Sequence, residues 1–185
     1  QFNTLAAQTT GVITATIIEG NIVTLSGLTE TGHALLINVT DASVASSALN
    51  TLNSKTTVAV NSTAVTTITG TAADINTTYT SVANGAIAGL GNEAVTLSNT
   101  SLSAAVLLTI DAHTTGLVNT AAITTITGTY AEIVAAYAGQ GQANRIFGLG
   151  NEAITVTDSV TVTQANIVAS LTTGVVTATI SDGDM

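Results

Sequence analysis

Alternation of apolar and hydroxyl-bearing residues dominates the hydropathy pattern of this chain. In segments such as Val95-Thr96-Leu97-Ser98 and Ile154-Thr155-Val156-Thr157, apolar and hydroxyl-bearing residues alternate from each position to the next. Successive side chains of a strand point to opposite faces, so this period predicts strands with one buried face. The branched residues Thr, Val and Ile favour extended backbone as well. The predicted strands begin near Ile37, Val65, Val95, Ile123 and Ile154.

A helical period follows several of these strands. Thr71-Ala72-Ala73-Asp74 and Thr129-Tyr130-Ala131-Glu132 place a hydroxyl at a helix start and a carboxylate three residues later, as in a capping box. Apolar residues then recur four positions apart, which predicts one narrow buried stripe per helix. The pairs are Ile75 and Tyr79, Val106 and Ile110, Ile133 and Tyr137, and Ile167 and Leu171. Extended segments that start with glycine, at 85–89, 116–119 and 174–180, follow the helices.

These elements recur at fixed intervals along the chain. Residues 65–71 (VTTITGT) return 58 residues later as 123–129 (ITTITGT), and residues 89–96 return 59 residues later as 148–155. Residues 1–22 return as 164–185, with 12 of 22 positions identical. Repetition of this kind is typical of arrays in which each repeat packs on its neighbours. The sequence therefore predicts an α/β solenoid, a β-rich rod of stacked strand, short helix and strand laps of about 29 residues.

One continuous repeat domain is predicted, with five laps in residues 37–185. Residues 1–36 are predicted to be a partial lap and a helix-less β segment, because residues 22–27 match a strand pattern and residues 28–34 replace the helix. Two interpretations of this segment stay open. It is either a local β-hairpin that bends the rod, or an apolar notch that receives a neighbouring rod.

Composition narrows the function classes. Thr supplies 38 of 185 residues and aromatic residues only 3%, which suits many thin core layers better than one large core. Lys55 and Arg145 are the only basic residues and the net charge is −9, whereas nucleic-acid binding needs clustered basic side chains. The absence of cysteine excludes disulfides and thiolate metal sites. No apolar run approaches the ~20 residues of a membrane span.

The sequence offers no candidate for catalysis. The two histidines, His33 and His113, stand at non-equivalent positions of the repeat, and the repeat partners of His113 are Lys55 and Leu171. A position that accepts such different side chains is a poor candidate for a general base or a metal ligand. We therefore expect no enzyme activity.

Two glutamates recur in the corner Gly-Leu-Gly-Asn-Glu-Ala. One interpretation is a calcium site, because carboxylate and amide oxygens gathered at a tight turn suit that ion. The alternative is structural: the asparagines satisfy corner amides, the glutamates cap the following lap, and glycine supplies positive φ. No other cofactor is expected. The calcium candidates are Glu93, Glu152, Asp158, Asp182 and Asp184.

The strings TTGVVTATISDGDM, TTITGTAADI and GLGNEAVTLS, with the helix-plus-turn segment 104–116, carry a resemblance that covers nearly the whole chain. They resemble the Thr/Ala-rich tandem repeats of very large secreted bacterial cell-surface proteins, best known from cyanobacteria. The resemblance implies an extracellular location and a structural or adhesive role. It carries no catalytic residues.

The expected function is a building block of an extracellular filament, matrix fibre or surface layer. Because the first and last segments are in phase, the expected partner is the chain itself, as a head-to-tail homopolymer or as covalent continuation of the repeats. The alternatives are an adhesin stalk, or an ice-binding face made of Thr-x-Thr pairs that do not obviously share one face. Glycans on Asn-x-Ser/Thr triplets or on Thr are further expected partners. The predicted assembly residues are Gln1, Val12, Thr14, Thr16, Ile22, Val175, Thr177, Thr179 and Met185.

Overall fold

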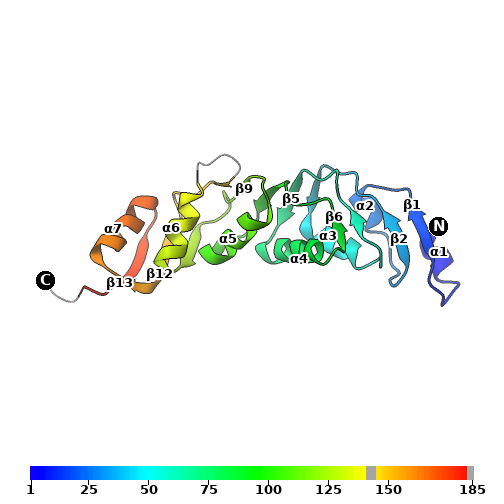
Figure 1. Ribbon diagram of the computed structural model, residues 1–185, viewed down its shortest axis with the longest axis horizontal. Helices are drawn as coiled ribbons and strands as arrows, with labels where there is room; N and C mark the ends of the chain where they lie inside the picture. The colour runs from blue at the N-terminus through cyan, green and yellow to red at the C-terminus, as the bar shows by residue number, and fades with distance from the viewer. Residues whose placement is uncertain (141–144, 183–185) are drawn as a thin grey trace. The chain divides into compact units, whose positions relative to one another are not determined.

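The computed structural model describes residues 1–140 and 145–182. Short helices and short parallel strands alternate along the chain (Figure 1), which gives a mixed α/β fold. The chain divides into two compact units, Gln1–Glu93 and Ala94–Met185.

In the first unit, strands pair in parallel across the helices that separate them. The strands are β1 (Thr14–Ile17), β2 (Ala34–Ile37), β3 (Ser43–Ala45), β4 (Val60–Asn61), β5 (Thr67–Gly70) and β6 (Ile87–Ala88). The helices are α1 (Phe2–Ala6), α2 (Ile22–Leu25), α3 (Ser46–Asn53) and α4 (Ala72–Ala83). β1 pairs with β2, β3 with β5 and β4 with β6. Helix α3 packs against both α2 and α4.

The second unit repeats this arrangement with longer runs of strands. Its strands are β7 (Ala94–Leu97), β8 (Ser101–Ser103), β9 (Val118–Asn119), β10 (Thr125–Gly128), β11 (Ile146–Phe147), β12 (Ala153–Val160) and β13 (Val176–Ile180). Its helices are α5 (Ala104–His113), α6 (Tyr130–Ala138) and α7 (Val162–Leu171). The strands run parallel in the orders β8-β10-β12-β13 and β7-β9-β11. Helix α6 packs against α5 and α7.

The core of each unit is made of apolar columns stacked in register. In the second unit, Leu102, Ile126 and Ile154 are register partners, and none is more than 9% exposed. In the first unit, Val44 is paired with Ile68, and both are buried. Parallel strands stack about 4.8 Å apart, so each successive strand adds one thin layer to the column. Small and branched side chains suffice for such layers.

Strands β5, β7, β10 and β12 begin within two residues of the predicted Val65, Val95, Ile123 and Ile154, whereas β2 ends at Ile37. Helices α3 to α7 begin at residues 46, 72, 104, 130 and 162, so the interval alternates between 26 and 32 residues around a mean of 29. Short additional strands, β3 and β8, precede α3 and α5. The winding of these laps into a solenoid, and their continuity as one domain, stay predictions.

The helix-less β segment predicted within residues 1–36, which begins at residue 22, is wrong. Helix α2 lies there, and it forms because the side chain of Asn21 accepts hydrogen bonds from the backbone N–H groups of Val23 and Thr24. Such a cap satisfies donors that a strand would present to a neighbour. The hairpin is wrong too, because β1 and β2 run parallel. The apolar notch was predicted from a missing helix, and this reason no longer applies because α2 is present.

The predicted helical stripes hold for α4 and α6, hold in part for α5, where Ile110 is buried but Val106 is not, and fail for α7. Ile75 with Tyr79, and Ile133 with Tyr137, are buried as predicted. In α7 the buried residue is Val168, while Ile167 is 39% exposed. In a helix that is apolar nearly all round, the neighbours it packs against decide which face is buried.

Candidate functional site

The strands that carry four of the nine predicted assembly residues lie at sheet edges. Thr14 and Thr16 are exposed on β1, and Thr177 and Thr179 are exposed on β13. The valine before each strand is almost fully exposed: Val12 is 72% and Val175 is 73% exposed. In the described part of the chain, β1 pairs with β2 alone and β13 with β12 alone, so each strand has an open edge. Open edges offer N–H and C=O groups to a further strand.

The remaining assembly candidates are placed differently. Gln1 is exposed before α1, whereas Ile22 is only 8% exposed as the first residue of α2. Ile22 is therefore a core residue and not part of an open edge. Met185 lies outside the described residues.

Glu152 forms a buried corner in the second unit. Its side chain has no exposed surface and accepts hydrogen bonds from the hydroxyl of Tyr137 at 2.6 Å and from the backbone N–H of Gly150 at 2.8 Å. Burial, together with the hydrogen bond to Glu152 and its charge, raises the pKa of Tyr137 above its usual range, against an opposing hydrogen bond with Thr172. Tyr137 thus stays a donor, and the corner is tied to helix α6.

Glu93 forms the equivalent corner in the first unit. Its carboxylate accepts hydrogen bonds from the hydroxyl of Tyr79 and from the backbone N–H groups of Gly91 at 2.7 Å and Asn92 at 3.1 Å. The glycines of both corners adopt positive φ, as the structural interpretation predicted; Gly91 has φ 126° and Gly150 has φ 129°. That interpretation was wrong about which side chain serves the corner amides, because the glutamates accept from them.

Asp158 and Asp182 accept hydrogen bonds at the N-termini of helices α6 and α7, which lie one lap earlier in the chain. Asp158 Oδ1 accepts from the first N–H of α6 at 2.9 Å, and Asp182 Oδ2 accepts from the first N–H of α7 at 2.8 Å. Asp41 does the same for α2 at 2.7 Å. A carboxylate at this position satisfies an orphan donor and complements the helix dipole. Each acid therefore links two successive laps.

The calcium candidates do not converge. Among the described residues, no three His, Cys, Asp or Glu side chains are grouped so as to hold a metal ion. Glu93 and Glu152 are engaged by tyrosine and backbone donors in separate corners, and Asp158 and Asp182 cap helices. Asp184 lies outside the described residues.

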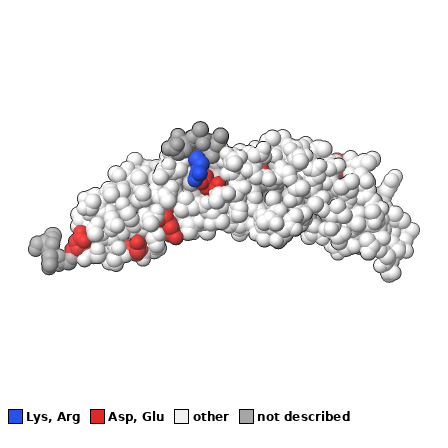
Figure 2. Space-filling view, in the orientation of Figure 1, with Lys and Arg blue, Asp and Glu red and all other residues white. Residues whose placement is uncertain are grey.

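An ion pair between a buried carboxylate and a half-exposed arginine distinguishes the described part of the second unit. Asp111 pairs with Arg145, with side-chain exposures of 3% and 50%. Burial raises the pKa of Asp111, and Arg145 partly opposes that shift. The repeat equivalents in the first unit are Asn53 and Ala86, so the pair is not a general feature of the laps. Figure 2 shows few charged side chains on the face it draws, scattered among uncharged residues.

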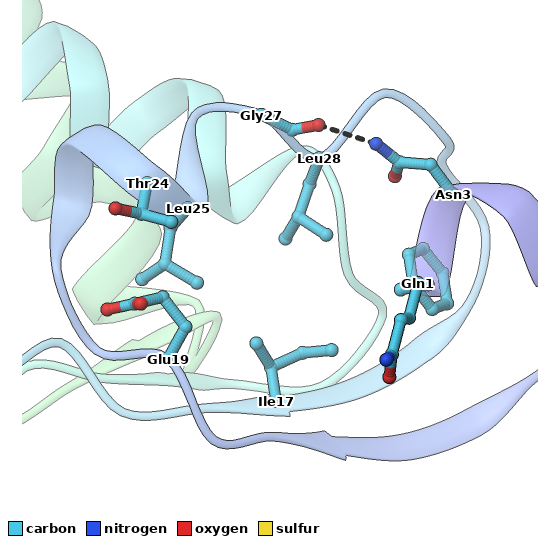
Figure 3. A pocket seen from close by; sticks show the side chains of 9 residues that line it. Gln1, Asn3, Ile17, Glu19, Thr24, Leu25, Gly27 and Leu28 are labelled. Atoms are coloured by element: carbon cyan, nitrogen blue, oxygen red, sulfur yellow. Dashed lines mark hydrogen bonds between the residues drawn. The ribbon is translucent and has the colours of Figure 1, made fainter.

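The histidine near the N-terminus has a structural environment. His33 Nδ1 accepts from the backbone N–H of Ile13 at 3.1 Å, and its ring meets the ring of Phe2 edge to face, with centroids 5.4 Å apart. A pocket of about 240 Å³ lies near this segment, between α1 and α2. Figure 3 shows Ile17, Leu25 and Leu28 around it and a hydrogen bond from Asn3 to Gly27 at its rim.

Threonine hydroxyls next to the strands donate to backbone carbonyls of neighbouring laps in both units. Thr66 Oγ1 donates to Ala42 O at 3.0 Å, and its repeat equivalent, Thr124, donates to Thr100 O at the same distance. Thr120 and Thr172 likewise donate to carbonyls 27 and 20 residues away. These bonds supplement the parallel ladders, so the high Thr content serves contacts between laps.

Comparisons with protein-family models, with curated proteins and with solved structures found no match to this chain. In the described residues, no helix has the length and apolar character needed to cross a membrane. Sequence reasoning missed the roles of Tyr79, Tyr137 and Asp41, because each acts on a residue at least 14 positions away.

Proposed function

We propose that this chain is a non-enzymatic, extracellular structural protein, the repeat unit of a filament, matrix fibre or surface layer. Its laps wind as a solenoid, and copies join end to end by parallel strand pairing. One observation carries the proposal. The sequence Thr-Ala-Thr-Ile forms both β1 and β13, and each of these strands has an open edge in the described chain.

Parallel pairing between copies would use the same interactions that hold the laps together. Every described strand pair is parallel, and the threonine hydroxyls that bond to neighbouring carbonyls recur throughout both units. The resemblance to Thr/Ala-rich surface repeats supports the extracellular location.

The test combines light scattering with electron microscopy of the purified chain over a range of concentrations. Assembly predicts masses that rise from 18.3 kDa in multiples of one chain, and filaments visible by negative stain. Protease treatment of intact cells tests the location, since an extracellular repeat is cleaved without lysis. A monodisperse monomer at high concentration would contradict the assembly.

A second candidate, a surface that binds ice or another ordered lattice, rests on one row of hydroxyls. Ser103, Thr127, Thr155 and Thr177 are successive register partners across β8, β10, β12 and β13. These four hydroxyl-bearing residues therefore lie side by side in one sheet, and the sequence did not predict this arrangement. Thermal hysteresis of the wild type, compared with Thr155→Val, tests this function; equal freezing points for protein and buffer would exclude it.

A further inference from the structure

Segment 1–17 is held to the following lap by a small set of contacts. Asn3 Nδ2 donates to Gly27 O at 2.6 Å, and Asn3 Oδ1 accepts from Thr29 N at 3.2 Å. Strand β1 pairs with β2 from Thr14 opposite Ala34 to Ile17 opposite Ile37. Ala6 is buried, and Phe2 touches His33.

The same segment is poorly packed. Leu5 is 55% exposed, and the pocket of about 240 Å³ in Figure 3 separates α1 from α2. The chain leaves β1 through Ile18, which is 99% exposed, so the chain can bend at Ile18 and Glu19, ahead of Gly20, whose carbonyl accepts from Thr40 N at 2.9 Å. Segment 1–17 is therefore the part of the first unit that is easiest to displace.

Segment 164–180 carries nearly the same contact residues. Asn166 and Ala169 correspond to Asn3 and Ala6, and both are exposed on α7. The turn before the strand is also the same, since Gly11 N donates to Thr9 Oγ1 at 3.0 Å and Gly174 N donates to Thr172 Oγ1 at 2.9 Å.

Helix α7 is ten residues long and starts with a complete capping box. Of Phe2, Asn3 and Ala6, only Phe2 lacks its equivalent, because Ala165 stands in its place. Segment 164–180 thus offers the contacts of segment 1–17 on a capped helix.

We propose that α7 and β13 of one copy displace α1 and β1 of a second copy and occupy their place against β2. This inference rests on the proposed end-to-end assembly and specifies its joint. Strand β13 then lies between its own β12 and the second copy's β2, with Thr177 opposite Ala34 and Ile180 opposite Ile37. Asn166 takes over the hydrogen bonds to Gly27 and Thr29. Exchange of equivalent elements between copies is a known route to assembly, and it is favoured when concentration offsets the advantage of the tethered segment.

A reversible lock on β1 tests the exchange. Thr16 and Leu36 are register partners, both exposed, on adjacent parallel strands whose spacing of about 4.8 Å suits a disulfide. The chain has no cysteine, so the double variant T16C/L36C forms one defined bond. The matched control is S43C/T67C, which bridges β3 and β5 in the same register geometry and leaves β1 free. Assembly is measured by light scattering in oxidising and reducing buffer.

Exchange predicts that oxidised T16C/L36C stays at the mass of one chain, that reduction restores assembly, and that oxidised S43C/T67C assembles like the wild type. If the oxidised lock assembles as well as the reduced form, copies stack on β1 and the exchange is wrong, while the proposed function stands. If the wild type itself does not assemble, both are wrong. Asn166→Ala gives an independent readout. It should raise the concentration needed for assembly at least threefold, whereas the exposed Asn151→Ala should not change it.

Discussion

The buried tyrosine and glutamate of each corner give the sharpest stability prediction. Tyr137 is 7% exposed and its hydroxyl donates to the fully buried Glu152 at 2.6 Å. In Tyr137→Phe the carboxylate keeps its bonds from Gly150 N but loses its only hydroxyl donor among the described contacts. A hydrogen bond to a charged group contributes about 1.5–3 kcal/mol, and because the N–H of Gly150 still donates to the carboxylate we expect a loss of about 2 kcal/mol.

Urea unfolding followed by circular dichroism measures this loss. With a slope of about 2 kcal/mol/M for a unit of this size, the midpoint should fall by about 1 M. The matched control is Tyr130→Phe at the start of the same helix, which is not fully buried and should shift the midpoint by less than about 0.3 M, as surface substitutions do. Equal shifts in the two variants, or none in Tyr137→Phe, would refute the view that the corner is a stabilising contact. Tyr79→Phe should repeat the result in the first unit.

Four further predictions concern the contacts between laps and the glutamate corners. Arg145→Ala leaves the buried Asp111 without its ion-pair partner and should lower the free energy of unfolding by about 2 kcal/mol. The double variant Asp111→Asn with Arg145→Ala recreates the Asn53 and Ala86 pair of the first unit. It should recover most of that loss in the same urea assay. Because the folded-state pKa of Asp111 is raised, the folded wild type binds this proton more tightly than the unfolded chain does. Its stability should therefore fall as pH rises from the unfolded pKa of 3.8 through the folded pKa. Asp111→Asn should remove that part of the pH dependence, and an unchanged profile of stability against pH would contradict the assignment. Asp158→Ala should lower stability by about 1 kcal/mol through loss of the cap on α6, and Asp158→Asn, which keeps an acceptor, by less. Calcium at millimolar concentration, or its removal by chelation, should leave the melting temperature unchanged, and a stabilisation of several degrees would restore the calcium interpretation of the corners.

Local signals predicted the elements whose causes lie within a few residues. The TTITGT strands, the N-cap at Thr71 and the capping box at Thr129 were predicted correctly, because alternation, branched residues and a hydroxyl with a carboxylate three residues on act on adjacent backbone. The same reasoning failed at residues 22–25, where the apolar run fits a strand equally well. There the cap from Asn21 and the carboxylate of Asp41, 19 residues on, favour the helix.

The sequence by itself determined the repeat, the alternation of strands with short helices and the scarcity of charge, since these depend on composition and on short-range periodicity. Only the tertiary structure decided which faces of α5 and α7 are buried, that the corner glutamates bind tyrosines, and that aspartates cap helices of the preceding lap. Those choices depend on partners 14 to 28 residues away, which parallel stacking brings into contact and linear spacing does not reveal.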